Sequence, residues 1–185
     1  MRIIAHVRAK PSIGSREYQE AFSQAYQTYC TRVFAYIYNR VTNVEVARDL
    51  TAEVFEKAYL KGQGVRAPQA YPAWLFMIAK NTVAGHFRQQ SRQSRGLKRI
   101  KESLSLRRSS EPIDQLIKGE ARSRLMELLR LLSPREQELL ALKFDGELSN
   151  EEIARVMGMS RGNVRVSVFR ALCKLRQRMK ETGDL

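Results

Sequence analysis

Apolar side chains recur every three or four residues through most of the N-terminal half, which is the spacing of one face of an α-helix. The pattern predicts three amphipathic helices, over residues 17–39, 42–60 and 71–90. Thr42 and Glu45 have the spacing of a capping box that would start the second helix. The repeating positions are Tyr18, Phe22, Ala25, Tyr29, Val33 and Ile37, then Val46, Leu50, Val54 and Ala58, then Trp74, Leu75, Ile78, Thr82 and Phe87.

Residues 132–176 carry start and stop signals for three more helices. A serine precedes each helix as a candidate N-cap, a glutamate three residues later completes a capping box at the first two, and a glycine ends those two helices. In chain order the signals are Ser133 with Pro134 and Glu136, Asp145-Gly146, Ser149 with Glu152, Gly158, and Ser160. A short helix, a glycine-containing turn and a longer helix predict a helix-turn-helix, and a further amphipathic helix is expected over 113–132.

The last helix, residues 161–180, divides into an apolar face and a basic face. We expect its apolar face to be buried against the two preceding helices through Val164, Val168, Ala171, Leu172 and Leu175, opposite Ile153, Ala154 and Leu140. The opposite face presents Arg161, Asn163, Arg165, Val166, Phe169 and Arg170. Such a face is typical of a recognition helix in a DNA major groove. An ordinary three-helix core with a solvated basic face would give the same pattern.

Between the two helical regions, residues 91–110 hold seven Lys or Arg, one Glu, six Ser and few apolar residues. Such a stretch cannot bury enough apolar surface to offset the entropy of ordering it. No segment alternates apolar and polar residues as a half-buried strand does. The predicted fold class is therefore all-α, with two small helical domains joined by a basic flexible linker. The predicted boundaries are 1–15 for a flexible extension, 16–92 for the first domain, 93–112 for the linker and 113–182 for the second domain.

The charge balance indicates an anionic partner. The chain of 185 residues has 33 Lys and Arg against 19 Asp and Glu, a formal net charge of +14, and nucleic acid is the expected counter-charge. No apolar run is long enough to span a membrane, and the first residues do not resemble a signal peptide. Cys30 and Cys173 are expected to be buried or half-buried free thiols in a reducing cytoplasm.

Candidate chemistry is sparse. His6 and His86 are isolated, and no glycine-rich phosphate loop or paired-carboxylate site is present. We therefore expect a cytoplasmic protein that is not an enzyme and has no metal, no cofactor and no small-molecule substrate.

Three blocks of sequence carry a likeness to a known family. They are DLTAEVFEKAY at 49–59, YPAWLFMIAKNT at 71–82 followed by Phe87-Arg88, and the helix-turn-helix at 132–176 with GNVR at 162–165. In this order and at this spacing they resemble the extracytoplasmic-function (ECF) group of bacterial RNA polymerase sigma factors. The resemblance covers nearly the whole chain. It implies a sigma-2 domain, a linker and a sigma-4 domain, with no sigma-3 domain between them.

The resemblance implies a protein that binds core RNA polymerase, at the β′ clamp helices and the β flap, and directs it to promoter DNA. The clamp helices would meet Asp49, Thr51, Ala52, Glu53 and Phe55. The sigma-2 domain would capture the melted −10 element through Tyr71, Lys80, Asn81, Arg88 and Arg92. Asn81 would form a hydrogen bond with a flipped base. The sigma-4 domain would read the −35 element as duplex through Ser160, Arg161, Asn163, Arg165, Val166, Ser167, Phe169 and Arg170. An anti-sigma factor is a further partner that many family members have.

Among these residues the chain departs from the family pattern at two places, one on the second predicted helix and one on the last. Ala52 stands where relatives often have Gln, so one polar contact to polymerase is absent from the expected set. Val166-Ser167 stands where many relatives have Ser-Arg. Ser167 therefore replaces an arginine that could contact a base, and Val166 adds an apolar side chain. The −35 sequence of the family therefore does not carry over to this chain.

The second predicted helix has an acidic edge formed by Asp49, Glu53 and Glu56. We expect this edge to lie beside exposed Phe55 and Tyr59, which is typical of a surface where another protein docks. Ion pairing along a wet helix face would give the same spacing.

Two other functions fit parts of the pattern. A stand-alone helix-turn-helix transcriptional regulator accounts for the C-terminal half but leaves the acidic edge and the 71–82 block unexplained. A sigma mimic that sequesters an anti-sigma factor has no need of basic DNA contacts, whereas Arg88, Arg92, Arg165 and Arg170 are all present.

Overall fold

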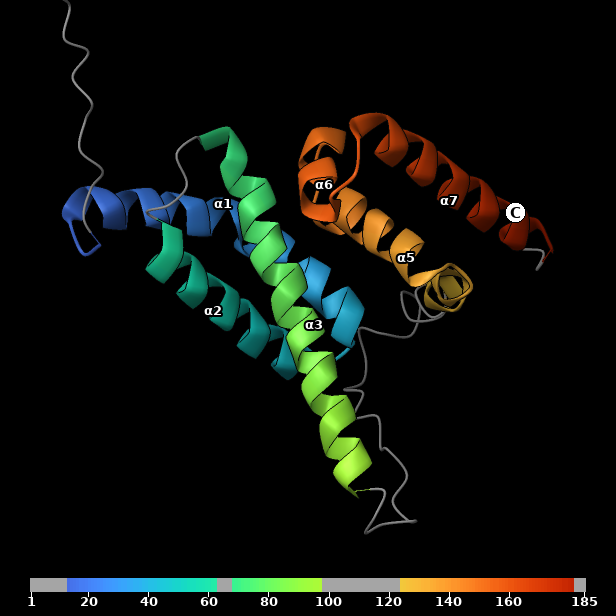
Figure 1. Ribbon diagram of the computed structural model, residues 1–185, viewed down its shortest axis with the longest axis horizontal. Coiled ribbons are helices and arrows are strands. Elements are labelled where there is room, and N and C mark those ends of the chain that lie inside the picture. The colour runs from blue at the N-terminus through green and yellow to red at the C-terminus, as the bar shows by residue number, and fades with distance from the viewer. Residues whose placement is uncertain (1–12, 63–67, 98–123, 182–185) are drawn as a thin grey trace, which may run out of the picture. The chain divides into compact units, whose positions relative to one another are not determined.

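The computed structural model describes residues 13–62, 68–97 and 124–181 (Figure 1). Every regular element among these residues is a helix and none is a strand, which confirms the all-α prediction. The chain divides into two compact units, one ending at Val83 and the other beginning at Ala84, inside a single helix. None of the described helices is long and apolar enough to cross a membrane. The predictions for 1–12 and 98–123 lie outside the described residues, and the domain boundaries stay predictions.

The N-terminal unit is built from α1 (Arg16–Val41), α2 (Val44–Lys61), the short 3₁₀ turn η2 (Pro68–Ala70) and the part of α3 (Tyr71–Leu97) up to Val83. Its core consists of aliphatic and aromatic side chains from the three long helices. The core residues include Val33, Tyr36 and Ile37 of α1, Leu50, Val54 and Ala58 of α2, and Leu75, Phe76 and Ala79 of α3. Among them are the predicted positions Val33, Ile37, Leu50, Val54, Ala58 and Leu75. Predicted Phe87 is instead 39% exposed, and Tyr36, Phe76 and Ala79 were not predicted. A Cβ atom at Gly62 would lie only 2.9 Å from the Tyr18 hydroxyl, so a larger residue at the end of α2 would have to displace that side chain.

Two helix boundaries differ from the prediction. The N-cap of α2 is Asn43, whose side-chain oxygen accepts a hydrogen bond from the Val46 amide at 3.0 Å. The predicted capping box at Thr42 is therefore wrong, because Thr42 adopts the left-handed conformation (φ 54°) that closes α1. The third helix continues to Leu97 rather than stopping near residue 90, so the first residues predicted as linker are helical. Arg and Gln in this extension are good helix formers, and they need no buried face to continue a helix that has already started.

The C-terminal unit contains a helical segment over 124–130, then α5 (Pro134–Leu140), the π-helical turn η3 (Ala141–Asp145), α6 (Asn150–Met157) and α7 (Arg161–Glu181). A hydrophobic core joins the 124–130 segment, α5 and α7 through Leu128, Leu132, Leu140, Ala171 and Leu175. The π-helical turn was not predicted. It ends as expected near Gly146, but the residue with left-handed backbone is Glu147, at φ 49°.

Candidate nucleic-acid and protein interfaces

The start of α7 is set by short-range signals that the sequence predicts correctly. Gly158 closes α6 in the left-handed conformation (φ 63°), where a side chain would be strained. Two residues later the Ser160 hydroxyl oxygen accepts a hydrogen bond from the Asn163 amide at 3.2 Å, which caps α7. The first turn of α7 therefore begins at a defined place, with exposed Arg161 and Asn163 beside the positive end of the helix dipole. Such a helix N-terminus is suited to binding a phosphate group.

The two faces of α7 are largely as predicted. Val164, Ala171 and Leu175 are buried, and Val168 packs against the core as a half-buried residue. Leu172 is the exception, because it is 40% exposed. By helical spacing Leu172 lies toward the outward-facing arc occupied by Arg165, so its predicted burial is wrong.

The outward face of α7 carries nearly all of the residues predicted to read duplex DNA. Phe169 is 66% exposed, and Ser167 is half-buried at the edge of the face. Basic side chains on this arc flank apolar ones, so the face combines charge with groups able to contact a thymine methyl. The exposed members are Ser160, Arg161, Asn163, Arg165, Val166, Phe169 and Arg170.

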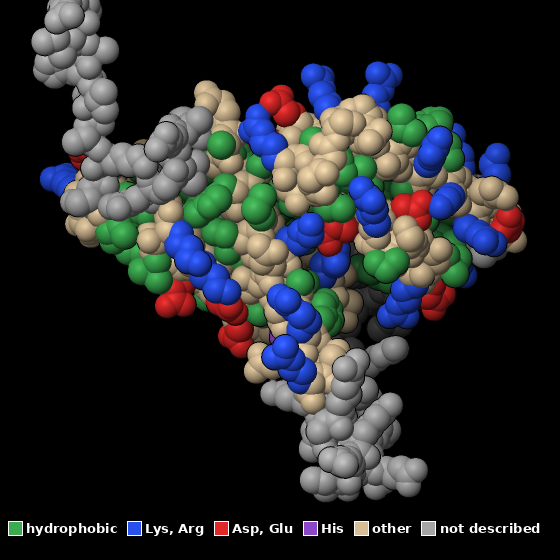
Figure 2. Space-filling view, in the orientation of Figure 1, with side chains coloured by type: hydrophobic (Ala, Val, Ile, Leu, Met, Phe, Trp, Pro, Cys, Tyr) green, Lys and Arg blue, Asp and Glu red, His purple; other side chains and the backbone are tan. Residues whose placement is uncertain are grey.

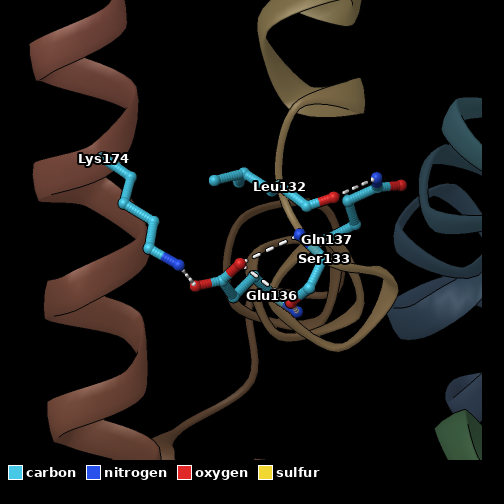
Figure 3. A network of polar contacts seen from close by, with 5 residues as sticks. All are labelled: Leu132, Ser133, Glu136, Gln137 and Lys174. Atoms are coloured by element: carbon cyan, nitrogen blue, oxygen red, sulfur yellow. Dashed lines mark hydrogen bonds and ion pairs between the residues drawn. The ribbon is translucent and has the colours of Figure 1, made fainter.

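The N-terminus of α5 is tied to α7 by one carboxylate (Figure 3). Oε2 of Glu136 accepts hydrogen bonds from the Ser133 amide (2.9 Å) and hydroxyl (2.8 Å), completing the predicted capping box. Oε1 of the same carboxylate pairs with Nζ of Lys174 on α7. Lys174 and then the Ser133 donors lower the pKa of Glu136 to about 2. Gln137 adds a hydrogen bond of 2.9 Å from its side-chain amide to the Leu132 carbonyl.

On α3, three of the five residues predicted to meet single-stranded DNA share one side of the helix. Asn81, Arg88 and Arg92 are seven and eleven residues apart, which places them on one face, and all three are exposed. Lys80 lies about a quarter turn away and is half-buried. A face with a base-edge donor and two positive charges has the chemistry that single-strand capture needs.

Tyr71 lies within an aromatic cluster at the start of α3. Its ring centroid is 5.5 Å from that of Trp74 and 5.8 Å from that of Tyr29. The hydroxyl is buried and has no hydrogen-bond partner among the described residues. Burial and, to a lesser extent, Tyr18 and Tyr29 raise the pKa of Tyr71 to about 12. The Tyr71 ring therefore packs against other aromatic rings, and its predicted role in stacking on a DNA base stays a prediction.

The acidic edge of α2 is present, and Figure 2 shows acidic side chains grouped along α2. Asp49, Ala52 and Glu56 are exposed and Glu53 is half-buried. The expected exposure of Phe55 is wrong, because Phe55 is only 4% exposed. The aromatic rings of Phe22 and Tyr26 on α1 pack against Phe55, with centroids 6.3 and 4.7 Å away.

Two further residues are less exposed than expected: Thr51, a polymerase contact implied by the family resemblance, and Tyr59, predicted to lie exposed beside the acidic edge. Thr51 is buried, and its hydroxyl donates a hydrogen bond of 2.7 Å to the Ala47 carbonyl within α2. Tyr59 is half-buried, and its ring lies 5.3 Å from that of Tyr18. The accessible part of the candidate docking edge is therefore Asp49, Ala52, Glu53 and Glu56.

Lys57 and Lys174 hold structural positions that the sequence does not reveal. Nζ of Lys57 pairs with Glu53 on α2 and also donates a hydrogen bond of 3.2 Å to the Thr82 hydroxyl on α3. The i,i+4 spacing of Glu53 and Lys57 is a visible signal, but the contact to Thr82 is not. No sequence signal links Glu136 to Lys174, 38 residues apart. Of the two free cysteines, Cys30 is half-buried as expected and Cys173 is exposed, contrary to expectation.

Two helical units, one of them a helix-turn-helix with a basic outer face, define a class of helical DNA-binding proteins. Comparison with known families identifies the class of protein more specifically. The family model "Sigma-70 region 2" matches residues 25–93, and "Sigma-70, region 4" matches residues 122–175. Together the two matches cover about two thirds of the chain.

Individual relatives agree with the family models. The ECF RNA polymerase sigma factor BldN of Streptomyces coelicolor is 34% identical over 155 residues, which are 83% of this chain and 58% of BldN. The RNA polymerase sigma factor YlaC of Bacillus subtilis is 25% identical over 168 residues, which are 91% of this chain and 97% of YlaC. The fold resembles that of the sigma factor RpoE from Bartonella quintana, with a TM-score of 0.66, 21% identity, and coverage of 87% of this chain and 98% of RpoE.

The chain belongs to the sigma-70 family, in the ECF group of alternative sigma factors that direct transcription initiation. The region 2 match covers the half of the chain that a stand-alone helix-turn-helix regulator leaves unexplained.

Proposed function

We propose that this protein binds core RNA polymerase in the cytoplasm and reads promoter DNA at two separate points, with residues assigned as follows. The observation that carries the proposal is the outward face of α7. A helix capped at a fixed point exposes Arg165, Phe169 and Arg170 on its outward side, and its N-terminus is suited to phosphate. Phosphate contacts at Ser160, Arg161 and Asn163 would fix the register of the helix on the −35 duplex, and the outward face would contact base edges.

The second point of contact is the face of α3 that holds Asn81. The amide of Asn81 can both donate and accept hydrogen bonds, as recognition of a base edge requires. Arg88 and Arg92 follow on the same side and supply positive charge along a strand of phosphates. This face would hold the −10 element once it is single-stranded.

The acidic edge of α2 is the proposed contact with the β′ clamp helices. It is a local negative surface on a protein with a net charge of +14, and the exposed carboxylates of Asp49 and Glu56 are its most accessible groups. Buried Thr51 and Phe55 would act by holding α2 in place. We also propose an anti-sigma factor as a regulator, because the similar sigma factor RpoE was solved in complex with the anti-sigma factor NepR.

Transcription in vitro from a genomic DNA library, with core RNA polymerase and this protein, tests the proposal. We expect new start sites that share two short upstream elements. Arg165→Ala and Arg170→Ala should each lose discrimination at the upstream element, by about 1–3 kcal/mol if the Arg makes a bidentate base contact. Asn81→Ala should reduce promoter opening and leave duplex −35 binding intact. Start sites that do not depend on the added protein would refute the proposal.

Two charge variants separate specific effects from loss of charge. Arg16→Ala removes one exposed positive charge from the start of α1, far in sequence from the proposed contacts, and should leave discrimination unchanged. Asp49→Lys should weaken binding to core polymerase without changing the −35 sequence that is read. Wild-type affinity for polymerase in Asp49→Lys would remove α2 from the proposed interface.

A further inference from the structure

The two carboxylate oxygens of Glu136 have different partners. Oε2 accepts both hydrogen bonds from Ser133 and so caps α5, whereas Oε1 pairs with Lys174 on α7 (Figure 3). Glutamine can fill the capping-box position as well as glutamate. The cap by itself therefore does not need the negative charge, and the ion pair to α7 does.

Lys174 differs from Arg178 of the same helix because its ammonium group is held by a carboxylate on another helix, whereas Arg178 pairs with Glu181 of α7 itself. The Glu136 side chain is only 16% exposed, whereas Lys174 is 60% exposed, so the lysine reaches inward to a fixed, sheltered acceptor. Lys174 follows Arg170 by one helical turn, and residues four apart are neighbours on a helix surface. The ion pair therefore fixes α7 against the start of α5 directly beside the face proposed to read DNA.

We propose that Glu136 and Lys174 are positioning residues for the recognition helix: the ion pair sets the orientation of α7 and withholds Lys174 from the DNA phosphates. The inference rests on the proposed function of α7 as the reader of the −35 element. Arg161, Arg165 and Arg170 then supply the DNA contacts, and Lys174 supplies none. The positive charge of Lys174 then sets the orientation of the recognition helix and does not add to its affinity for DNA.

Salt dependence distinguishes the two roles. A side chain that contacts a phosphate displaces a bound counterion, so its removal lowers the slope of log K against log salt by about 0.9. We expect Lys174→Met to leave that slope unchanged, while Arg161→Ala, at a proposed phosphate contact, lowers it. Both Lys174→Met and Glu136→Gln should lower the preference for the −35 sequence over a scrambled one by roughly two- to fivefold, the range of an ion pair of this exposure.

The experiment uses polymerase holoenzyme reconstituted with full-length variants. The probes are a duplex with the −35 element recovered from the genomic library and the same duplex with that element scrambled. Binding is measured from low to moderate salt. Lys174→Arg keeps the charge and should restore discrimination. The double variant Glu136→Gln, Lys174→Met should lose no more than either single variant, because both remove the same pair. Circular dichroism at the assay temperature verifies that each variant is folded.

Two results would overturn the inference. A slope lowered by about one in Lys174→Met would make Lys174 an ordinary phosphate contact. Unchanged discrimination in folded Glu136→Gln and Lys174→Met would reduce the pair to a stabilising contact. Failure of the proposed function looks different, because Arg161→Ala would then leave the slope unchanged, and Arg165→Ala and Arg170→Ala would leave the discrimination unchanged.

Discussion

Removal of the buried hydroxyl of Tyr71 is predicted to stabilise the protein, whereas most substitutions in a protein core destabilise it. The oxygen has no hydrogen-bond partner among the described residues, although the ring itself packs well against Trp74 and Tyr29. Tyr71→Phe removes the oxygen and keeps the ring. We expect this variant to be more stable than the wild-type protein, because folding no longer removes water from a hydroxyl that forms no hydrogen bond in the folded state.

The magnitude follows from two opposing effects. An unpaired buried polar group costs about 1–3 kcal/mol. Removing one oxygen atom leaves a small void, and the void cancels part of the stability gained by removing the unpaired hydroxyl. We expect the free energy of unfolding of the N-terminal unit to rise by about 1 kcal/mol. With a urea m-value of about 1–2 kcal/mol/M for a unit of this size, the midpoint should rise by roughly 0.5–1 M.

Urea unfolding of the full-length protein, followed by tryptophan fluorescence, measures this effect. Trp74 is the single tryptophan of the chain and its ring centroid lies 5.5 Å from that of Tyr71, so the signal reports on the N-terminal unit. Tyr18→Phe is the matched control. The Tyr18 hydroxyl donates a hydrogen bond to the Tyr59 carbonyl, and its loss should lower stability by about 1 kcal/mol.

Alkaline pH provides a second measurement on the same residue. The pKa of Tyr71 is raised to about 12, so the folded state keeps this proton at a higher pH than the unfolded state does. The associated stability is present below pH 10 and is lost as pH rises toward 12. Tyr71→Phe should therefore lose less stability than wild type over that range. A lower urea midpoint in Tyr71→Phe, or equal effects of the two substitutions, would show that the Tyr71 hydroxyl has a partner and would refute the reasoning.

The remaining predictions concern a strained turn and an acid-sensitive contact. Thr42 has a left-handed backbone at φ 54°, which is costly for a β-branched residue. Thr42→Gly should raise stability by about 0.5–1 kcal/mol in urea unfolding, and a loss would mean that the Thr42 side chain makes a contact that outweighs the strain. Glu136 has a pKa lowered to about 2 by Lys174 and Ser133. Its contribution is present above about pH 4.5 and is lost as pH falls toward 2. Circular dichroism should show Glu136→Gln losing less stability than wild type across that range.

The sequence predicts much of the fold because many of its signals are local. A capping box such as Ser149 with Glu152 acts over three residues, and Gly158 acts through its own backbone, so both can be identified from spacing alone. The capping error at the start of α2 arises where two neighbouring polar residues compete. Thr42 and Asn43 can each serve as a cap, and asparagine is the better acceptor.

The candidate sites are harder to predict because exposure depends on what a partner helix covers. The position of Phe55 on α2 gives no indication that the aromatic side chains of α1 lie over it. The same holds for the contact of Lys57 with Thr82 and for that of Glu136 with Lys174, which join residues far apart in the chain. On α7 the outward residues were predictable, because the apolar face is buried and the residues on the opposite side of the helix are therefore exposed. The exposure of Leu172 was not predictable, because that residue lies at the border between the two faces.

The serine caps also bear on how the protein is made. Each cap fixes a helix start with residues three apart, and helical domains with mostly local contacts fold within microseconds to milliseconds. A ribosome adds about 5–20 residues per second, so the synthesis of one unit takes seconds. The N-terminal unit can therefore fold before the helix-turn-helix has been synthesised, and the two halves need not compete for each other's apolar side chains while they form.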